Sequence, residues 1–84
     1  MAKSIFTKEY ALFLYHLRTA RKAAGLTQEQ VASRLQQTQS FISKCERGER
    51  RIDVVELRAF CQAVGKPLIE FIQQLETAIE QVEK

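Results

Sequence analysis

Apolar residues recur at intervals of three and four along five stretches of the chain, and polar residues fill the positions between them. This spacing gives each stretch one face for burial and is typical of amphipathic helices, whereas strands alternate with a period of two. The predicted helices cover about residues 8–24, 28–35, 39–47, 54–64 and 67–84. We therefore predict an all-α fold of five helices in a single domain, with a body at residues 1–66 and a C-terminal helix at residues 67–84.

Residues that favour helix ends stand at the borders of these stretches. Threonine and aspartate accept an amide proton that the first turn of a helix leaves unpaired, and glycine takes the left-handed conformation that follows a last turn. The candidate caps are Thr7, Thr27, Thr38 and Asp53, and the candidate stops are Gly25, Gly48 and Gly65. Glu56 stands three residues after Asp53, which predicts a capping box, and Pro67 suits the first turn of the last helix.

The second and third predicted helices are joined by only two residues, Gln36 and Gln37. Their apolar positions form one compact set, made of Val31, Ala32, Leu35, Ile42 and Cys45. The small Ala32 lies where two helices joined by so short a turn must approach closely, as in a helix-turn-helix. The other face of the third helix is mostly polar, which predicts a reader of the DNA major groove.

The charge is divided along the chain. Residues 1–66 carry twelve Lys or Arg against six Asp or Glu, whereas residues 67–84 carry one Lys against four Glu. The body is therefore +6 and the C-terminal helix −3, which suggests that the body meets a polyanion. On charge alone, an unevenly charged but merely solvated surface explains the division equally well.

Position along the third helix assigns the candidate DNA contacts. Side chains near the N-terminal end of a helix in the major groove reach base edges first, and a glutamine amide pairs with N6 and N7 of adenine. The candidates for base readout are Gln39, Ser40, Phe41, Ser43 and Lys44, and those for phosphate contacts are Thr27, Gln28, Thr38, Arg47, Arg50 and Arg51. Lys44 also suits a phosphate. Two alternatives stay open: Phe41 folds back onto the first or second helix, and the arginines lie in a solvated loop.

These motifs resemble the helix-turn-helix domains of the phage repressor and Cro type, also called the XRE family. The resemblance extends from about Leu17 to Ile72, and it rests on Arg21, Gly25 to Gln28, Ala32, Leu35, Ile42, Ser43, Glu46 to Gly48, and Ala63 to Gly65. It implies a five-helix, lambda-repressor-like domain that binds operator DNA as a dimer with its third helix in the groove. It also implies an internal ion pair between Arg21 and Glu46.

The chain departs from the family pattern at the turn between the second and third helices. Gln36 stands where glycine is usual, and Gln37 stands where an apolar residue is usual. If the turn keeps the backbone of the family, a side chain at positive φ costs on the order of 1 kcal/mol at Gln36. A turn of altered shape is the alternative. Lys66 also replaces a frequent apolar residue before the fifth helix.

The fifth helix carries an apolar seam at spacings of four and three, which begins at Leu68 and continues through Ile72, Leu75, Ile79 and Val82. A seam of this period is typical of helix pairing. We expect Ile72, Leu75, Ile79 and Val82 to form a homodimer interface, because the helix is longer than one small domain needs to cover its base. Packing of this seam against the first helix of the same chain is the alternative, and the two arrangements can coexist.

Catalysis, cofactors and metals have no support in the sequence. His16 is the single histidine, and no nucleophile, phosphate-binding loop or metal-ligand cluster accompanies it. No signal peptide or membrane span is visible, so we expect a cytoplasmic protein. The sequence predicts a sequence-specific transcriptional regulator that acts as a homodimer on a palindromic operator. An antitoxin or adaptor that binds a partner protein, with DNA binding secondary, is the alternative.

Overall fold

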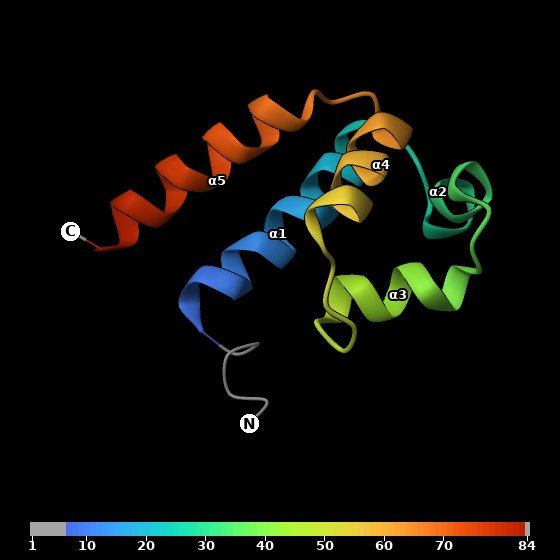
Figure 1. Ribbon diagram of the computed structural model, residues 1–84, viewed down its shortest axis with the longest axis horizontal. Coiled ribbons are helices and arrows are strands. Elements are labelled where there is room, and N and C mark those ends of the chain that lie inside the picture. Colours follow the sequence, from blue (N-terminus) through green and yellow to red (C-terminus); the bar gives the residue numbers. More distant parts are fainter. Residues whose placement is uncertain (1–6, 84) are drawn as a thin grey trace.

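The computed structural model describes residues 7–83, which form five α-helices. These are α1 (Lys8–Ala23), α2 (Gln28–Leu35), α3 (Gln39–Arg47), α4 (Val54–Val64) and α5 (Leu68–Glu83). In Figure 1, α1 runs through the middle of the molecule, with α5 on one side of it and α3 on the other. The prediction of an all-α, five-helix fold is confirmed, and the helix ends agree with the sequence to within about one residue.

Side-chain caps begin four of the helices. The hydroxyl groups of Thr7, Thr27 and Thr38 each accept a hydrogen bond from the backbone amide three residues later. Asp53 and Glu56 form the predicted capping box. Thr27 and Gln30 form a second capping box, which was not predicted. These bonds satisfy amide groups that helix geometry alone leaves unpaired.

The turn between α2 and α3 contains a residue in the left-handed conformation, and this residue is a glutamine instead of the usual glycine. Gln36 has φ 57° and ψ 41° and is the only non-glycine residue with positive φ among residues 7–83. The amide of Gln37 donates to the carbonyl of Ala32 at 2.9 Å, and that of Gln36 donates to Ser33 at 3.2 Å. This is the Schellman pattern that ordinarily uses glycine. Two hydrogen bonds at the end of α2 therefore offset the cost of a side chain in this conformation.

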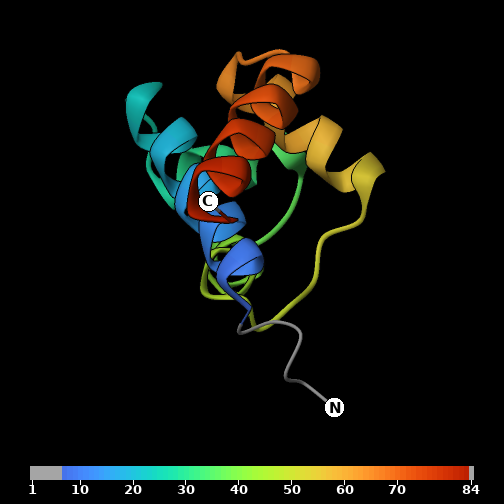
Figure 2. The same ribbon diagram turned by 90° about the vertical axis from the view of Figure 1, so that its left-hand side faces the viewer.

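The hydrophobic core lies around α1, which packs against α3, α4 and α5. Leu17 of α1 is fully buried, and the ring of Phe13 meets that of Phe71 edge to face at 6.0 Å between centroids. Figure 2 shows α5 in front of α1, and the two helices pack against each other. His16 extends this contact, because its ring lies 6.3 Å from that of Phe71. Burial and the positive charge of Lys66 lower the pKa of His16.

The predicted seam of α5 is divided between the core and solvent. Leu75 packs against the core, and Ile79 is half-buried where α5 passes the start of α1. Ile72 and Val82 stay 42% and 49% exposed, and Ile69, outside the seam, is 73% exposed. Packing onto the same chain, which the sequence left as an alternative, therefore accounts for part of the seam. The rest of the apolar surface of α5 has no cover within residues 7–83.

A buried ion pair joins α1 to the end of α3. Nε of Arg21 lies 2.7 Å from Oε2 of Glu46, and Nη2 donates to Oε1 at 3.0 Å. The two side chains are only 10% and 2% exposed. Arg21 also donates to the carbonyl of Leu26, and Arg18 donates to the carbonyl of Glu46. The charged groups are thus enclosed but fully engaged, which is the condition under which a buried pair is tolerated.

We expect Glu46→Ala to lower the free energy of unfolding by about 3–5 kcal/mol, because it leaves the guanidinium of Arg21 buried without a counter-charge. Urea unfolding followed by circular dichroism measures the loss. The matched control is Glu49→Ala, which breaks an exposed ion pair and should change stability little. Equal effects of the two substitutions would contradict the assignment of Arg21 and Glu46 as a core constraint.

Candidate nucleic-acid interface

The third helix presents one buried and one open face. Ile42, Cys45 and Glu46 are buried against the rest of the molecule. Gln39, Ser40, Lys44 and Arg47 are exposed, and Ser43 is half-buried. Because residues four apart lie above one another on a helix, Gln39, Ser43 and Arg47 form a continuous polar strip along the open face. The helix itself lies on the side of α1 away from α5 (Figure 1).

Hydrogen bonds link this strip to the buried ion pair. Oε1 of Glu46, which also binds Arg21, accepts a hydrogen bond from Nε2 of Gln28 at 3.0 Å. Oε1 of Gln28 in turn accepts a hydrogen bond from Nε2 of Gln39 at 2.6 Å. The carboxylate in the core therefore orients Gln28 at the start of α2, and Gln28 orients Gln39 at the start of α3.

The amide of Gln39 keeps the groups that a base requires. A side-chain amide has two N–H donors and one carbonyl acceptor, and the bond to Gln28 uses one donor. The second donor and the acceptor are the pair that meets N7 and N6 of adenine. A glutamine fixed in this way loses less side-chain entropy when it binds than a freely rotating one.

Phe41 is not the fully open side chain that the sequence suggested. It is half-buried, packs against the core, and lines a small apolar pocket with Leu35 and Phe60. The guanidinium of Arg50 lies 4.7 Å from the centroid of its ring. The structure thus favours the alternative that Phe41 folds back onto the body, with Arg50 as its outer cover. Its contribution to base readout is limited to the part of the ring that remains accessible.

Three arginines at the end of α3 and in the loop after it have partners within the protein. Arg47 forms two hydrogen bonds with the carboxylate of Glu49, at 2.9 and 3.1 Å, and a third with Oγ of Ser43. Arg50 forms two with Glu56, at 2.8 and 3.0 Å. The guanidinium of Arg51 lies 4.9 Å from the ring centroid of Tyr10. The predicted basic cluster is therefore partly neutralised within the protein itself.

These ion pairs move the pKa values of the two carboxyl groups. The hydrogen bond and charge of Arg47, followed by the charge of Lys44, lower the pKa of Glu49. The hydrogen bond from Arg50 and the backbone of Asp53 lower the pKa of Glu56. Both carboxylates are thus favoured in their charged form, and both compete with any other anion for the arginines.

The threonines assigned to phosphate contacts have a structural role as well. Oγ1 of Thr27 accepts a hydrogen bond from the amide of Gln30 at 3.1 Å, and that of Thr38 accepts one from Phe41 at 3.0 Å. Each hydroxyl keeps its own proton, which is free to be donated outward because both residues are exposed. The first-turn amides of α2 and α3 add the positive end of a helix dipole beside them.

Other kinds of site find little support among residues 7–83. Cys45 and Cys61 are buried thiols without a disulfide, and burial raises the pKa of each. Within this range no group of three or more histidine, cysteine or acidic side chains is placed to hold a metal ion. The described helices are all too short or too polar to cross a membrane.

Comparison with known proteins identifies the family. The family model described as a helix-turn-helix domain matches residues 14–70. An uncharacterized HTH-type transcriptional regulator, y4dJ, of Sinorhizobium fredii is 38% identical over 52 residues, which cover 62% of this chain and 68% of that protein. An XRE-family like protein from Pseudomonas syringae pv. tomato superimposes with a TM-score of 0.82 at 42% identity. The superposition covers 90% of this chain and 93% of that chain.

These matches agree with the resemblance to the XRE family that the sequence showed. They are also consistent with an α3 whose polar face is open for contact with DNA. They also agree with the expectation that the protein is not an enzyme, because the matched family consists of regulators. The chain belongs to the XRE family of helix-turn-helix transcriptional regulators, which are DNA-binding proteins.

Proposed function

We propose that the protein is a sequence-specific regulator that binds a palindromic operator as a homodimer, with α3 of each subunit in the major groove. The observation that supports this most is the linked set of side chains from Glu46 through Gln28 to Gln39. A surface glutamine has no structural need for such support. It is the arrangement that base recognition requires, because a reader must meet a base edge at a fixed distance and angle.

In this proposal the open face of α3 divides into base and backbone contacts. Gln39 and Ser40, at the start of the helix, reach the base edges, and Ser43 and Lys44 follow one turn later. Thr27 and Thr38 meet phosphates through their hydroxyl groups and through the amides at the helix starts. Gln28 supports both kinds of contact. It lies at the start of α2, where it can meet a phosphate, and it also holds Gln39 in place for base contact.

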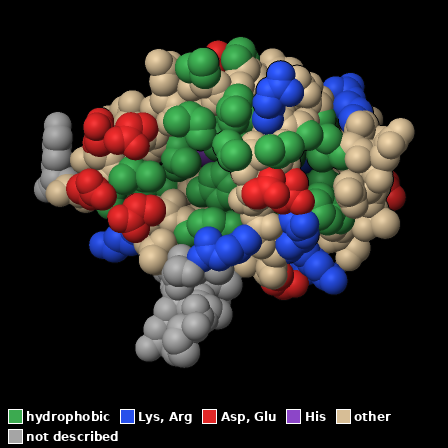
Figure 3. Space-filling view, in the orientation of Figure 1, with side chains coloured by type: hydrophobic (Ala, Val, Ile, Leu, Met, Phe, Trp, Pro, Cys, Tyr) green, Lys and Arg blue, Asp and Glu red, His purple; other side chains and the backbone are tan. Residues whose placement is uncertain are grey.

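The proposal assigns dimerisation to the uncovered apolar surface of α5. Ile69, Ile72 and Val82 are large apolar side chains that are at least 42% exposed. Figure 3 shows apolar side chains across the middle of one face of the molecule, beside α5, and acidic groups at the left, where α5 ends. Because α3 lies on the other side of α1, a twofold partner on α5 leaves both recognition helices open. Such a dimer reads two half-sites about one DNA turn apart.

We expect Gln39→Ala to reduce discrimination at one base pair of each half-site by roughly 1–3 kcal/mol while leaving affinity for random DNA almost unchanged. The site is first obtained by selection from random duplex DNA, and affinities for single-base variants are then measured by fluorescence anisotropy. Gln73→Ala on α5 is the matched control, since Gln73 is also exposed.

An equal loss on operator and random DNA would contradict the assignment of Gln39 to base readout. Failure of the wild-type protein to enrich any sequence, together with a stable hetero-complex isolated from cells, would overturn the proposed function in favour of the adaptor or antitoxin alternative.

We expect Ile72→Lys combined with Val82→Lys to shift the protein from dimer to monomer in sedimentation equilibrium, because each lysine places a charge at an apolar contact. Binding to a full palindrome should weaken much more than binding to a single half-site. Val55→Lys on α4 is the control, because Val55 is also an exposed apolar residue, at 73% exposure, and lies outside α5. A wild-type protein that sediments as a monomer at all concentrations would contradict the assigned interface.

A further inference from the structure

We infer that Glu49 is a specificity-determining residue: it competes with DNA phosphates for Arg47 and thereby weakens binding to DNA that lacks the operator sequence. The inference rests on the proposed binding of DNA by α3. It concerns a carboxylate that directly follows the C-terminal end of that helix, after Gly48.

Glu49 binds the guanidinium of Arg47 through both of its carboxylate oxygens. The guanidinium of Arg47 meets both oxygens of Glu49, through Nε at 2.9 Å and Nη2 at 3.1 Å. Its remaining group, Nη1, donates to Oγ of Ser43. A two-oxygen grip on a guanidinium is also the way in which a phosphate binds arginine. Glu49 therefore occupies the same donors that a phosphate would use.

The position of the pair makes the competition relevant. Arg47 ends the polar strip that begins at Gln39, and both members of the pair have side chains that are 54% exposed. Lys44 is close enough for its charge to act on Glu49. A carboxylate among these cations lowers the positive potential where the helix meets the phosphate backbone, and it repels phosphates directly.

Competition from Glu49 weakens binding to random DNA more than binding to the operator. Affinity for random DNA is almost entirely electrostatic. An arginine that is bound to an internal carboxylate therefore contributes little to this affinity. On the operator, base contacts from Gln39 hold α3 deep in the groove and keep a phosphate close to Arg47. Arg47 then exchanges Glu49 for the phosphate. The exposed pair is weak enough for this exchange, because surface ion pairs contribute little to stability.

The test is the affinity and salt dependence of Glu49→Gln on random and selected DNA. We expect binding to random DNA to strengthen several-fold and the slope of log affinity against log salt to steepen by about one, as for one added phosphate contact. Binding to the selected operator should change less. Circular dichroism checks that the fold is unchanged.

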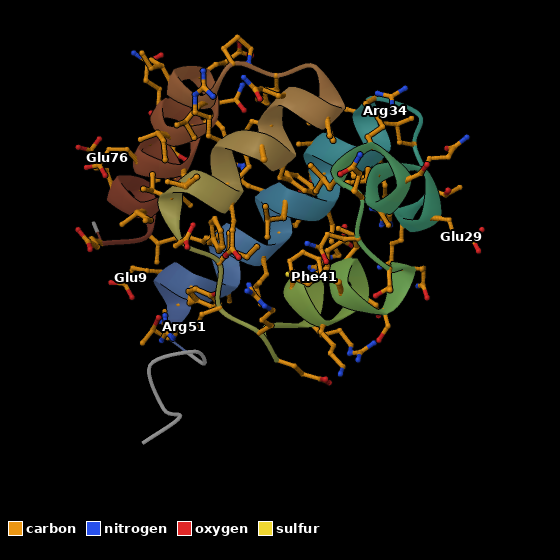
Figure 4. All side chains as sticks on the ribbon, turned by 45° about the vertical axis from the view of Figure 1, so that its right-hand side comes forward. Glu9, Glu29, Arg34, Phe41, Arg51 and Glu76 are labelled. Carbon is orange, nitrogen blue, oxygen red and sulfur yellow. The ribbon has the colours of Figure 1, made fainter. Side chains whose placement is uncertain are left out.

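Two matched variants separate the mechanism from a simple change of charge. Glu76→Gln on α5 makes the same change in charge, and Figure 4 places Glu76 on the side of the molecule away from α3. It should have little effect. In an Arg47→Gln background, Glu49→Gln should gain much less, because no arginine is left to release and only the direct repulsion between Glu49 and phosphates is removed.

The inference is overturned if Glu49→Gln leaves random-DNA binding unchanged, or if its gain equals that of Glu76→Gln or persists in full without Arg47. The proposed function fails by a different result, namely the absence of any preferred sequence for the wild-type protein. The two failures are therefore distinguishable.

Discussion

The ion pair between Arg21 and Glu46 is the constraint on which the rest of the structure depends. Charges that are 10% and 2% exposed are costly unless every donor and acceptor has a partner. The guanidinium meets two carboxylate oxygens and a backbone carbonyl, and the carboxylate also takes a hydrogen bond from Gln28. One carboxylate thereby fixes α3 against α1 and sets the start of α2, so fold stability and the orientation of Gln39 have a common origin.

The molecule keeps its two exposed surfaces apart. The third helix, which carries the polar strip, lies on one side of α1, and α5, which carries uncovered apolar residues, lies on the other. The charge follows the same division, since the body is basic and α5 carries only acidic charges among residues 68–83. This arrangement allows DNA and a second subunit to approach from different sides. The basic surface is moderated by Glu49 and Glu56, which neutralise two of its arginines.

The sequence predicted those features that depend on local interactions, and it missed or left open those that depend on how loops and helices meet. Caps and helix ends follow from residues three or four positions apart, so they were found. The ion pair was implied only by family resemblance. The pairing of Arg50 with Glu56 and the folding back of Phe41 depend on the path of the loop after Gly48, which no periodicity encodes. The spacing Thr27 to Gln30 did carry the signal of a second capping box.

The most direct test of the account is a double-mutant cycle between Gln28 and Gln39 in which discrimination at the base pair read by Gln39 is measured. If Gln28 acts by holding Gln39, then Gln28→Ala should lose much of the preference at that base pair. Adding Gln28→Ala to Gln39→Ala should cause no further loss there. If the two substitutions reduced discrimination additively, or if Gln28→Ala kept full discrimination at that base pair, the result would contradict the claim. The claim is that the hydrogen bonds from the core position Gln39.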